Sequence, residues 1–431
     1  MSTEWESFDW RSTVVPRQPL SDSDRERLGV PLTLRPIEDA RALQAPVFDP
    51  ALKHHQHGYR ATDPRFEEPG LTATWQAARR RAMDLVLCAI ADSGWVDHLV
   101  LRGSVLLRAW FGEAAREPGD LDFVLVPEDW EVDEERTEGM LRGIAAAVER
   151  TATLSAGPVR FEAAAAVDEE IWTYDRVPGR RLVLPWTAGE LPGGAIQLDF
   201  VFNESLPVPS APIAIPSSTG APAAVLHAAT PELSLAWKLM WLATDTYPQG
   251  KDLYDAVLLA EHTLLRYQVL RDAFVGGDPE FALTPVTTAT VDRIAAEVEW
   301  DHFQGEYPQI TGTDAEYTER LAAALAPVFS SGPATLEGRS LKQWWLAGWT
   351  ARYREVFAEE GMSATQAAMA REGLPIAAAM VVTGELLGLE QPSPDEIMPM
   401  LLGHRAWKHW GASWEEDRDY FLDVVLRALD D

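Results

Sequence analysis

Acidic side chains at three places in the sequence could together hold a metal ion. Asp120 and Asp122 are two residues apart where the chain enters an apolar strand, residues 121–126, so both point to the same side of that strand. Asp199 interrupts a second apolar strand, residues 196–202, where an unpaired carboxylate is costly. Like charges this close repel unless a cation lies between them, and carboxylates suit Mg²⁺. Three such acids fit two-metal phosphoryl or nucleotidyl transfer.

A short Gly-Ser sequence precedes the first two acids. Gly103 and Ser104 follow an apolar strand, residues 99–101, and lead into a helix predicted over 105–111. Glycine allows a phosphate to approach the backbone, and the N–H groups at a helix start attract that anion. The alternative is an ordinary Gly-Ser turn followed by a solvated Asp-x-Asp loop.

A third motif carries lysines, which are rare in this chain: only five of its 37 basic residues are lysine. Lys238 lies in an apolar helix, and Lys251 and Asp252 begin the next helix, with Asp255 about one turn further on. A lysine suits the role of a point charge on a triphosphate. The alternative is structural, with Asp252 capping its helix and Lys251 pairing with Asp255.

Together these motifs resemble the AbiEii/AbiGii-type nucleotidyltransferase toxins of bacterial type IV toxin–antitoxin and abortive-infection systems, a branch of the polymerase-β-like superfamily. Order and spacing are similar over about residues 75–330. The Gly-Ser and Asp-x-Asp motif is shared by the whole superfamily, whereas the lysine segment is more particular to these toxins. In one departure, Pro118 stands where the family usually has Ser or Thr, two residues before the first metal-binding Asp.

The resemblance implies a role for each motif. It implies a Mg²⁺-dependent enzyme that moves an NMP from an NTP to an acceptor, in several members tRNA, and that a partner antitoxin neutralises. Catalysis would then depend on the three acids, with Asp199 as a possible general base, and on the lysine segment. The implied metal ligands are Asp120, Asp122 and Asp199; the implied catalytic residues are these three with Lys238 and Asp252; the implied nucleotide-binding residues are Gly103, Ser104, Arg116, Lys238 and Lys251.

Hydrophobic periodicity predicts the elements that position these motifs. These elements indicate an α/β half followed by an all-helical half. The resemblance implies that the fold is α+β, a polymerase-β-like mixed sheet with flanking helices followed by an all-helical C-terminal region. We expect an extended arm over residues 1–70, a catalytic domain over 71–224, a helical domain completing the active site over 225–335 and a helical extension over 336–431. Further predicted helices are 75–91, 138–151, 232–243, 252–267, 314–329 and 341–359; residues 159–166 are predicted as a strand and 206–224 as a linker.

Composition limits the classes of partner. The 431-residue chain has a formal net charge of −30, which excludes a globally basic coat for nucleic acid or membrane. A tRNA acceptor would therefore need a small local patch, for which the candidates are Arg102, Arg108, Arg116, Lys238 and Lys251. The single cysteine excludes an internal disulfide, and the absence of a signal peptide or bilayer-length apolar run predicts a cytoplasmic protein without membrane contact.

Two other clusters have less specific interpretations. His54, His55 and His57 have no carboxylate at useful sequence spacing, so a solvated loop is favoured over a metal site. A C-terminal tryptophan cluster is expected to pack between helices, and a surface for a partner or for RNA stacking is the alternative; it comprises Trp344, Trp345, Trp349, Trp407, Trp410 and Trp414. Two alternative functions follow: a small-molecule (antibiotic) nucleotidyltransferase, and an inactive binding protein that uses these helices.

Overall fold

In the computed structural model, the chain divides into two units. The structure describes residues 4–173, 177–204, 206–278, 281, 284–295, 298–330, 338–389, 393–405, 407, 408, 411, 414, 416 and 418. Unit 1 comprises Met1–Glu204, Pro209–Thr230 and Asp245–Tyr247, and unit 2 comprises Ser205–Val208, Pro231–Thr244 and Pro248–Asp431. The three acids lie in unit 1 and the lysine motif in unit 2.

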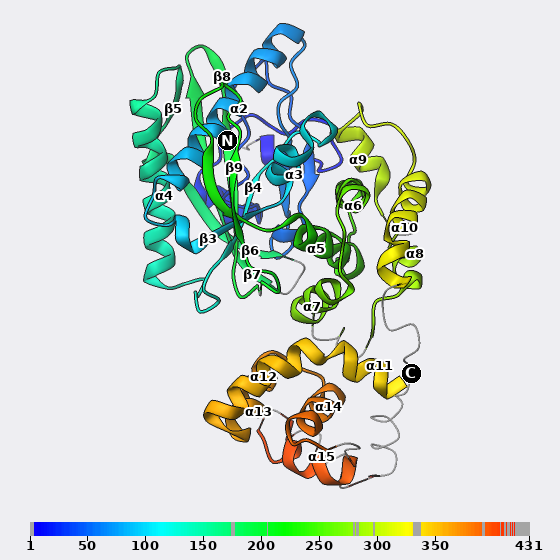
Figure 1. Ribbon diagram of the computed structural model, residues 1–431. Helices are drawn as coiled ribbons and strands as arrows, with labels where there is room; N and C mark the ends of the chain where they lie inside the picture. The colour runs from blue at the N-terminus through cyan, green and yellow to red at the C-terminus, as the bar shows by residue number, and fades with distance from the viewer. Residues whose placement is uncertain are drawn as a thin grey trace. The chain divides into compact units, whose positions relative to one another are not determined.

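Unit 1 is built on a mixed sheet (Figure 1). Its strands run in the order β5-β7-β8-β4-β3-β10-β9, with β6 paired to β7. The pairs β4–β8 and β3–β10 are parallel, and the other pairs are antiparallel. The strands are β3 (Leu99–Arg102), β4 (Leu121–Leu125), β5 (Val159–Phe161), β6 (Val167–Thr173), β7 (Val177–Ala188), β8 (Leu191–Val201), β9 (Ala211–Ile215) and β10 (Ala224–Ala228).

Helices cover this sheet because their apolar sides need a partner. Helix α2 (Pro69–Ala91) packs on β8 and β10, and α4 (Glu135–Leu154) packs on α2 and β5. Strands β3 and β4 and the last four residues of β8 are almost continuously buried, since they form the middle of the sheet. Helix α3 (Ser104–Phe111) begins directly after β3 and Gly103, so one short connection carries the Gly-Ser motif.

The N-terminal arm is part of unit 1. It contains α1 (Asp22–Leu28), the two-stranded sheet β1 (Pro46–Phe48) and β2 (Tyr59–Ala61), and the 3₁₀ turns η1 (Glu4–Ser7) and η2 (Pro50–Leu52). Its own apolar cluster includes Trp5, Val30 and Leu34. Turn η2 lies against β6, which brings the arm onto the β6–β7 side of the sheet.

Unit 2 is helical wherever its secondary structure is regular in the described residues. The helices α5 and α6 pack against each other and carry the lysine motif, and α12 packs on α7. Their bounds are α5 (Pro231–Thr244), α6 (Gly250–His262), α7 (Tyr267–Gly277), α8 (Thr288–Ala295), α9 (Trp300–Glu306), α10 (Asp314–Ser330), α11 (Gly338–Trp345), α12 (Ala347–Glu360), α13 (Met362–Arg371), α14 (Ile376–Leu386) and α15 (Pro394–Leu402).

The expected α+β class with a mixed sheet and a helical C-terminal region is confirmed. Several local predictions were wrong. The strand predicted over 159–166 ends at Phe161 and continues as a 3₁₀ turn, and the supposed linker 206–224 contains β9, which pairs with β10. The helix predicted over 252–267 ends at His262, and the long strands β6 and β7 were not foreseen.

Trp75 tests how firmly α2 is attached to the sheet. Its side chain is 1% exposed, lies 5.5 Å from Trp186 between ring centroids, and donates its indole N–H to Gly193 O at 3.1 Å. We expect Trp75→Ala to lower the free energy of unfolding by about 3–5 kcal/mol, because it leaves a large cavity. Denaturant unfolding measures this change. Trp172→Ala, at a 38% exposed position, is the matched control and should cost less than about 1 kcal/mol; equal losses would contradict the assignment of Trp75 to the core.

Candidate active site

A row of charged side chains crosses the middle of the unit 1 sheet. Strand register pairs Glu169 with Arg181, Arg181 with Asp199, Asp199 with Asp122, and Asp122 with Arg102. Residues in register on neighbouring strands project from the same face of a sheet. We call these five residues the charge row. Along it, acid and base are neighbours everywhere except at Asp199 and Asp122, where two carboxylates stand side by side.

Asp120 adds a third carboxylate at this point. Asp120 is the residue directly before β4. One carboxylate oxygen from each of Asp120, Asp122 and Asp199 lies within 4.8 Å of the other two. Burial raises the pKa of Asp199; Arg181 opposes this, whereas the negative charge of Asp120 adds to it. Convergent carboxylate oxygens are the donor set of a hard divalent cation. The three acids therefore fit such an ion, as the sequence predicted from their residue types.

The Asp122 carboxylate lies against the backbone of Gly103, where no side chain fits. The φ of +82° at Gly103 favours glycine, and a Cβ at this position would overlap Oδ2 of Asp122. The next residue, Ser104, begins α3 and is 1% exposed, and its Oγ has no hydrogen-bond partner among the described residues. A buried hydroxyl without a partner beside a helix start can serve a phosphate oxygen.

Arg79 of α2 holds the loop that leads into Asp120. Its buried guanidinium donates to Pro118 O at 2.8 Å and to Gly119 O at 2.7 Å, and its Nε lies 3.2 Å from an oxygen of Asp63 in the arm. Because the loop offers backbone carbonyls to Arg79, it does not need a side chain at Pro118 to be fixed. Sequence reasoning missed Arg79, since nothing in its helix marks which of three consecutive arginines faces inward.

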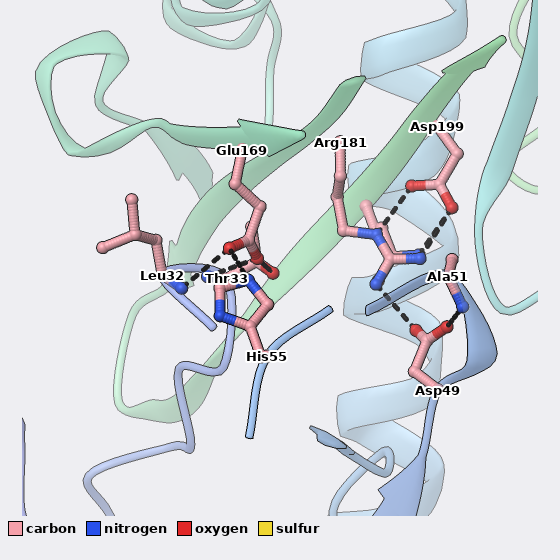
Figure 2. A network of polar contacts seen from close by, with 9 residues as sticks. Leu32, Thr33, Asp49, Ala51, His55, Glu169, Arg181 and Asp199 are labelled. Atoms are coloured by element: carbon pink, nitrogen blue, oxygen red, sulfur yellow. Dashed lines mark hydrogen bonds and ion pairs between the residues drawn. The ribbon is translucent and has the colours of Figure 1, made fainter. Parts of the chain in front are cut away.

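Arg181 is the second residue that sequence reasoning missed. It donates from Nε and Nη2 to the two oxygens of Asp199, both at 2.8 Å, and from Nη1 to Asp49 at 2.7 Å (Figure 2). Burial alone would lower the pKa of Arg181, but the two carboxylates outweigh it and hold that pKa well above its ordinary value. A guanidinium fork bound in two directions is a rigid support for Asp199. The available signal was a pair of arginines, residues 180–181, directly before an apolar segment, residues 182–186.

Glu169, at the end of the charge row, anchors the arm. It accepts hydrogen bonds from the backbone N–H groups of Leu32 at 2.9 Å and Thr33 at 3.0 Å, and it lies 3.2 Å from Nε2 of His55 (Figure 2). Burial alone would raise the pKa of Glu169, but these contacts lower it. The solvated-loop interpretation of the histidines was therefore wrong for His55, whose carboxylate partner is distant in sequence.

In unit 2, Lys238 is buried between two acids. Its Nζ lies 2.6 Å from Oδ1 of Asp252 and 3.0 Å from Oδ2 of Asp255, and 4.9 Å from the ring centroid of Trp241. The local alternative considered for this segment was wrong: the N-cap position of α6 is Gln249, whose side chain makes no capping hydrogen bond, and Asp255 pairs with Lys238 of the neighbouring helix. Lys251, one residue before Asp252, is half-buried.

Three of the five candidates for a basic patch are buried, and Arg108 and Lys251 are half-buried. Arg102 is buried and pairs with Glu204, Arg116 is buried, and Lys238 is enclosed as described. Arg108 donates to the carbonyls of Gly112 and Ala115. Arg102 and Lys238 are thus held by acidic partners, because buried charges require partners.

Three of the six residues of the tryptophan cluster are buried, and Trp344 and Trp414 are half-buried. Trp345, Trp349 and Trp407 are buried, Trp344 contacts the Arg271 guanidinium, and Trp410 lies outside the described residues. Buried rings cannot stack on bases, so helix packing is confirmed for these three. In the part of the chain that the structure describes, no helix is both long and apolar enough to span a bilayer.

Comparison with known proteins agrees with the geometry. A search of curated proteins finds no match. The family model described as "Nucleotidyl transferase AbiEii toxin, Type IV TA system" matches residues 85–326, a range that includes the whole charge row, Asp120, the Gly-Ser motif and the lysine motif. It does not include the arm or Arg79. Because the match covers more than half of the chain, the protein belongs to the AbiEii nucleotidyltransferase toxin family.

Proposed function

We propose that the chain transfers an NMP from an NTP to an acceptor, with Mg²⁺ held by Asp120, Asp122 and Asp199, and that it acts in the cytoplasm as a toxin neutralised by a partner antitoxin. The observation that carries this proposal is the convergence of three carboxylate oxygens within 4.8 Å in a member of the AbiEii family. When bound, Mg²⁺ would offset the negative charge of the triphosphate and of the departing pyrophosphate.

The chain's own residues would bind the nucleotide and position its reacting groups. Ser104 would donate its buried Oγ–H to a phosphate oxygen at the start of α3. Lys238, whose Nζ lies between Asp252 and Asp255, would contact the phosphates, and Arg116 and Lys251 would complete nucleotide binding.

Asp199 would accept the proton of the attacking hydroxyl. Burial raises the pKa of its carboxyl group, which makes the carboxylate a better base, while the Arg181 fork keeps both oxygens fixed. A carboxylate oxygen has two lone pairs, so an oxygen that accepts from Arg181 can still take a proton or contact a cation. Asp120 and Asp122 would remain charged and serve as metal ligands.

The acceptor class divides into two candidates. Transfer to tRNA agrees with the resemblance of the motifs to toxins that modify tRNA. A cationic small molecule such as an aminoglycoside is the second candidate, and the observation favouring it is electrostatic: the net charge is −30, and Arg102, Arg116 and Lys238 are buried. Competition between tRNA and an aminoglycoside panel in one labelling reaction separates them.

Loss of either strand-borne acid should abolish transfer. We expect Asp122→Asn and Asp199→Asn each to reduce the rate at least about 100-fold, because each removes charge where the phosphates must be stabilised. The measurement is transfer of label from each of the four NTPs, with Mg²⁺ and total tRNA present. Asp97→Asn is the control, since its side chain is 82% exposed. Full activity in either site variant, with label still transferred by the wild type, would contradict the assigned roles.

Lys238 should affect the rate of transfer as well as the stability of the fold. We expect Lys238→Met to reduce transfer about 100-fold or more and to lower stability by about 3–5 kcal/mol, since two acids lose their buried partner. Asp255→Asn keeps the Lys238–Asp252 pair and should cost less than about 10-fold in rate. Labelling assays and denaturant unfolding on the same preparations provide the comparison. If activity falls in step with stability in both variants, Lys238 is structural and does not contact the phosphates.

A further inference from the structure

We propose that the N-terminal arm is part of the catalytic apparatus: Asp49 of the arm and Arg181 of β7 are positioning residues that hold Asp199 in place and preserve its ability to bind a cation. This inference rests on the proposed function of the three acids. It assigns a role to an arm that lies outside the family match, which begins at residue 85.

The first step is geometric. Arg181 contacts both oxygens of Asp199 through one side of its guanidinium, and the remaining Nη1 contacts Oδ2 of Asp49 at 2.7 Å (Figure 2). Asp49 is itself fixed, because its Oδ1 accepts from the N–H of Ala51 at 3.1 Å and caps the turn η2. The position of Asp199 is therefore connected through a single guanidinium to a capped turn of the arm.

The second step is electrostatic. Arg181 and Asp199 alone would form a neutral buried pair, and a carboxylate fully neutralised by a guanidinium attracts a cation weakly. Sharing Arg181 with Asp49 leaves the group of three with a net charge of −1. All three side chains are largely buried, where such effects are screened little by solvent.

The third step separates this role from simple docking of the arm. Glu169 attaches another part of the arm, through Leu32 and Thr33, and no described contact joins the Glu169 carboxylate to Asp199. If the arm only needed to be attached, Glu169 and Asp49 would be equivalent. If the arm supplies charge and support to Asp199, only Asp49 affects the metal site.

The test measures Mn²⁺ binding to the full chain by calorimetry without any NTP, so that it does not depend on activity. Asp49→Asn is the informative variant, because asparagine retains the capping of η2 but removes the charge that faces Arg181. Glu169→Gln is the matched acid-to-amide control. We expect Asp49→Asn to weaken Mn²⁺ binding about 10-fold or more, as for outer partners of metal ligands, and Asp49→Glu to restore part of it. Glu169→Gln should remain within about 2-fold of the wild type, less than the usual effect of an outer partner.

The results distinguish a positioning role of Asp49 from simple attachment of the arm. Equal losses in Asp49→Asn and Glu169→Gln would overturn the inference in favour of simple docking, and so would wild-type affinity in Asp49→Asn while Asp122→Asn abolishes binding. Hydrogen exchange of residues 46–61 reports whether the arm has detached in either variant; weakened Mn²⁺ binding with an attached arm supports the inference, whereas weakening only with detachment overturns it. A wild-type chain that binds no Mn²⁺ would overturn the proposed metal site and this inference with it.

Discussion

Two carboxylates, Asp122 and Asp199, are held side by side on parallel strands in the middle of a buried sheet. Their negative charges repel each other, and the arrangement of unit 1 depends on how this repulsion is compensated. Buried like charges are tolerated only when fixed partners or a cation compensate for them. Arginines flank the pair on the neighbouring strands, Arg181 beside Asp199 and Arg102 beside Asp122. The arginines partly offset the negative charge of the two acids, and the three convergent carboxylate oxygens are suited to a metal ion.

Each supporting arginine extends the site into a more distant part of unit 1. Arg181 connects Asp199 to the arm, Arg102 is paired with Glu204 just after β8, and Arg79 connects the loop before Asp120 to α2. Rigid placement of charged groups by buried partners is what electrostatic catalysis requires, because the groups need not reorient during the reaction.

The sequence predicted the parts of this site that local pattern determines. Asp199 was identified because an acid inside an apolar strand is costly, and the Asp-x-Asp pair because its spacing places two acids on one side. Arg181 and Asp49 were missed, since their contact joins residues 132 positions apart and the hairpin of β6 and β7 was not recognised. The partners of Lys238 were also misjudged: local spacing suggested Lys251 with Asp255, whereas packing of α5 on α6 decided the pairing. Long-range packing thus selects among charges that sequence spacing leaves equivalent.

The central claim is that the three acids form the metal site of a nucleotidyltransferase. The most direct measurement is the anomalous scattering of Mn²⁺ in crystals grown with a non-hydrolysable NTP analogue. The account predicts Mn²⁺ between the carboxylates of Asp120, Asp122 and Asp199, in contact with the triphosphate, with Arg181 still bound to Asp199. Mn²⁺ located elsewhere on the chain, or a nucleotide bound away from these three residues, would contradict it.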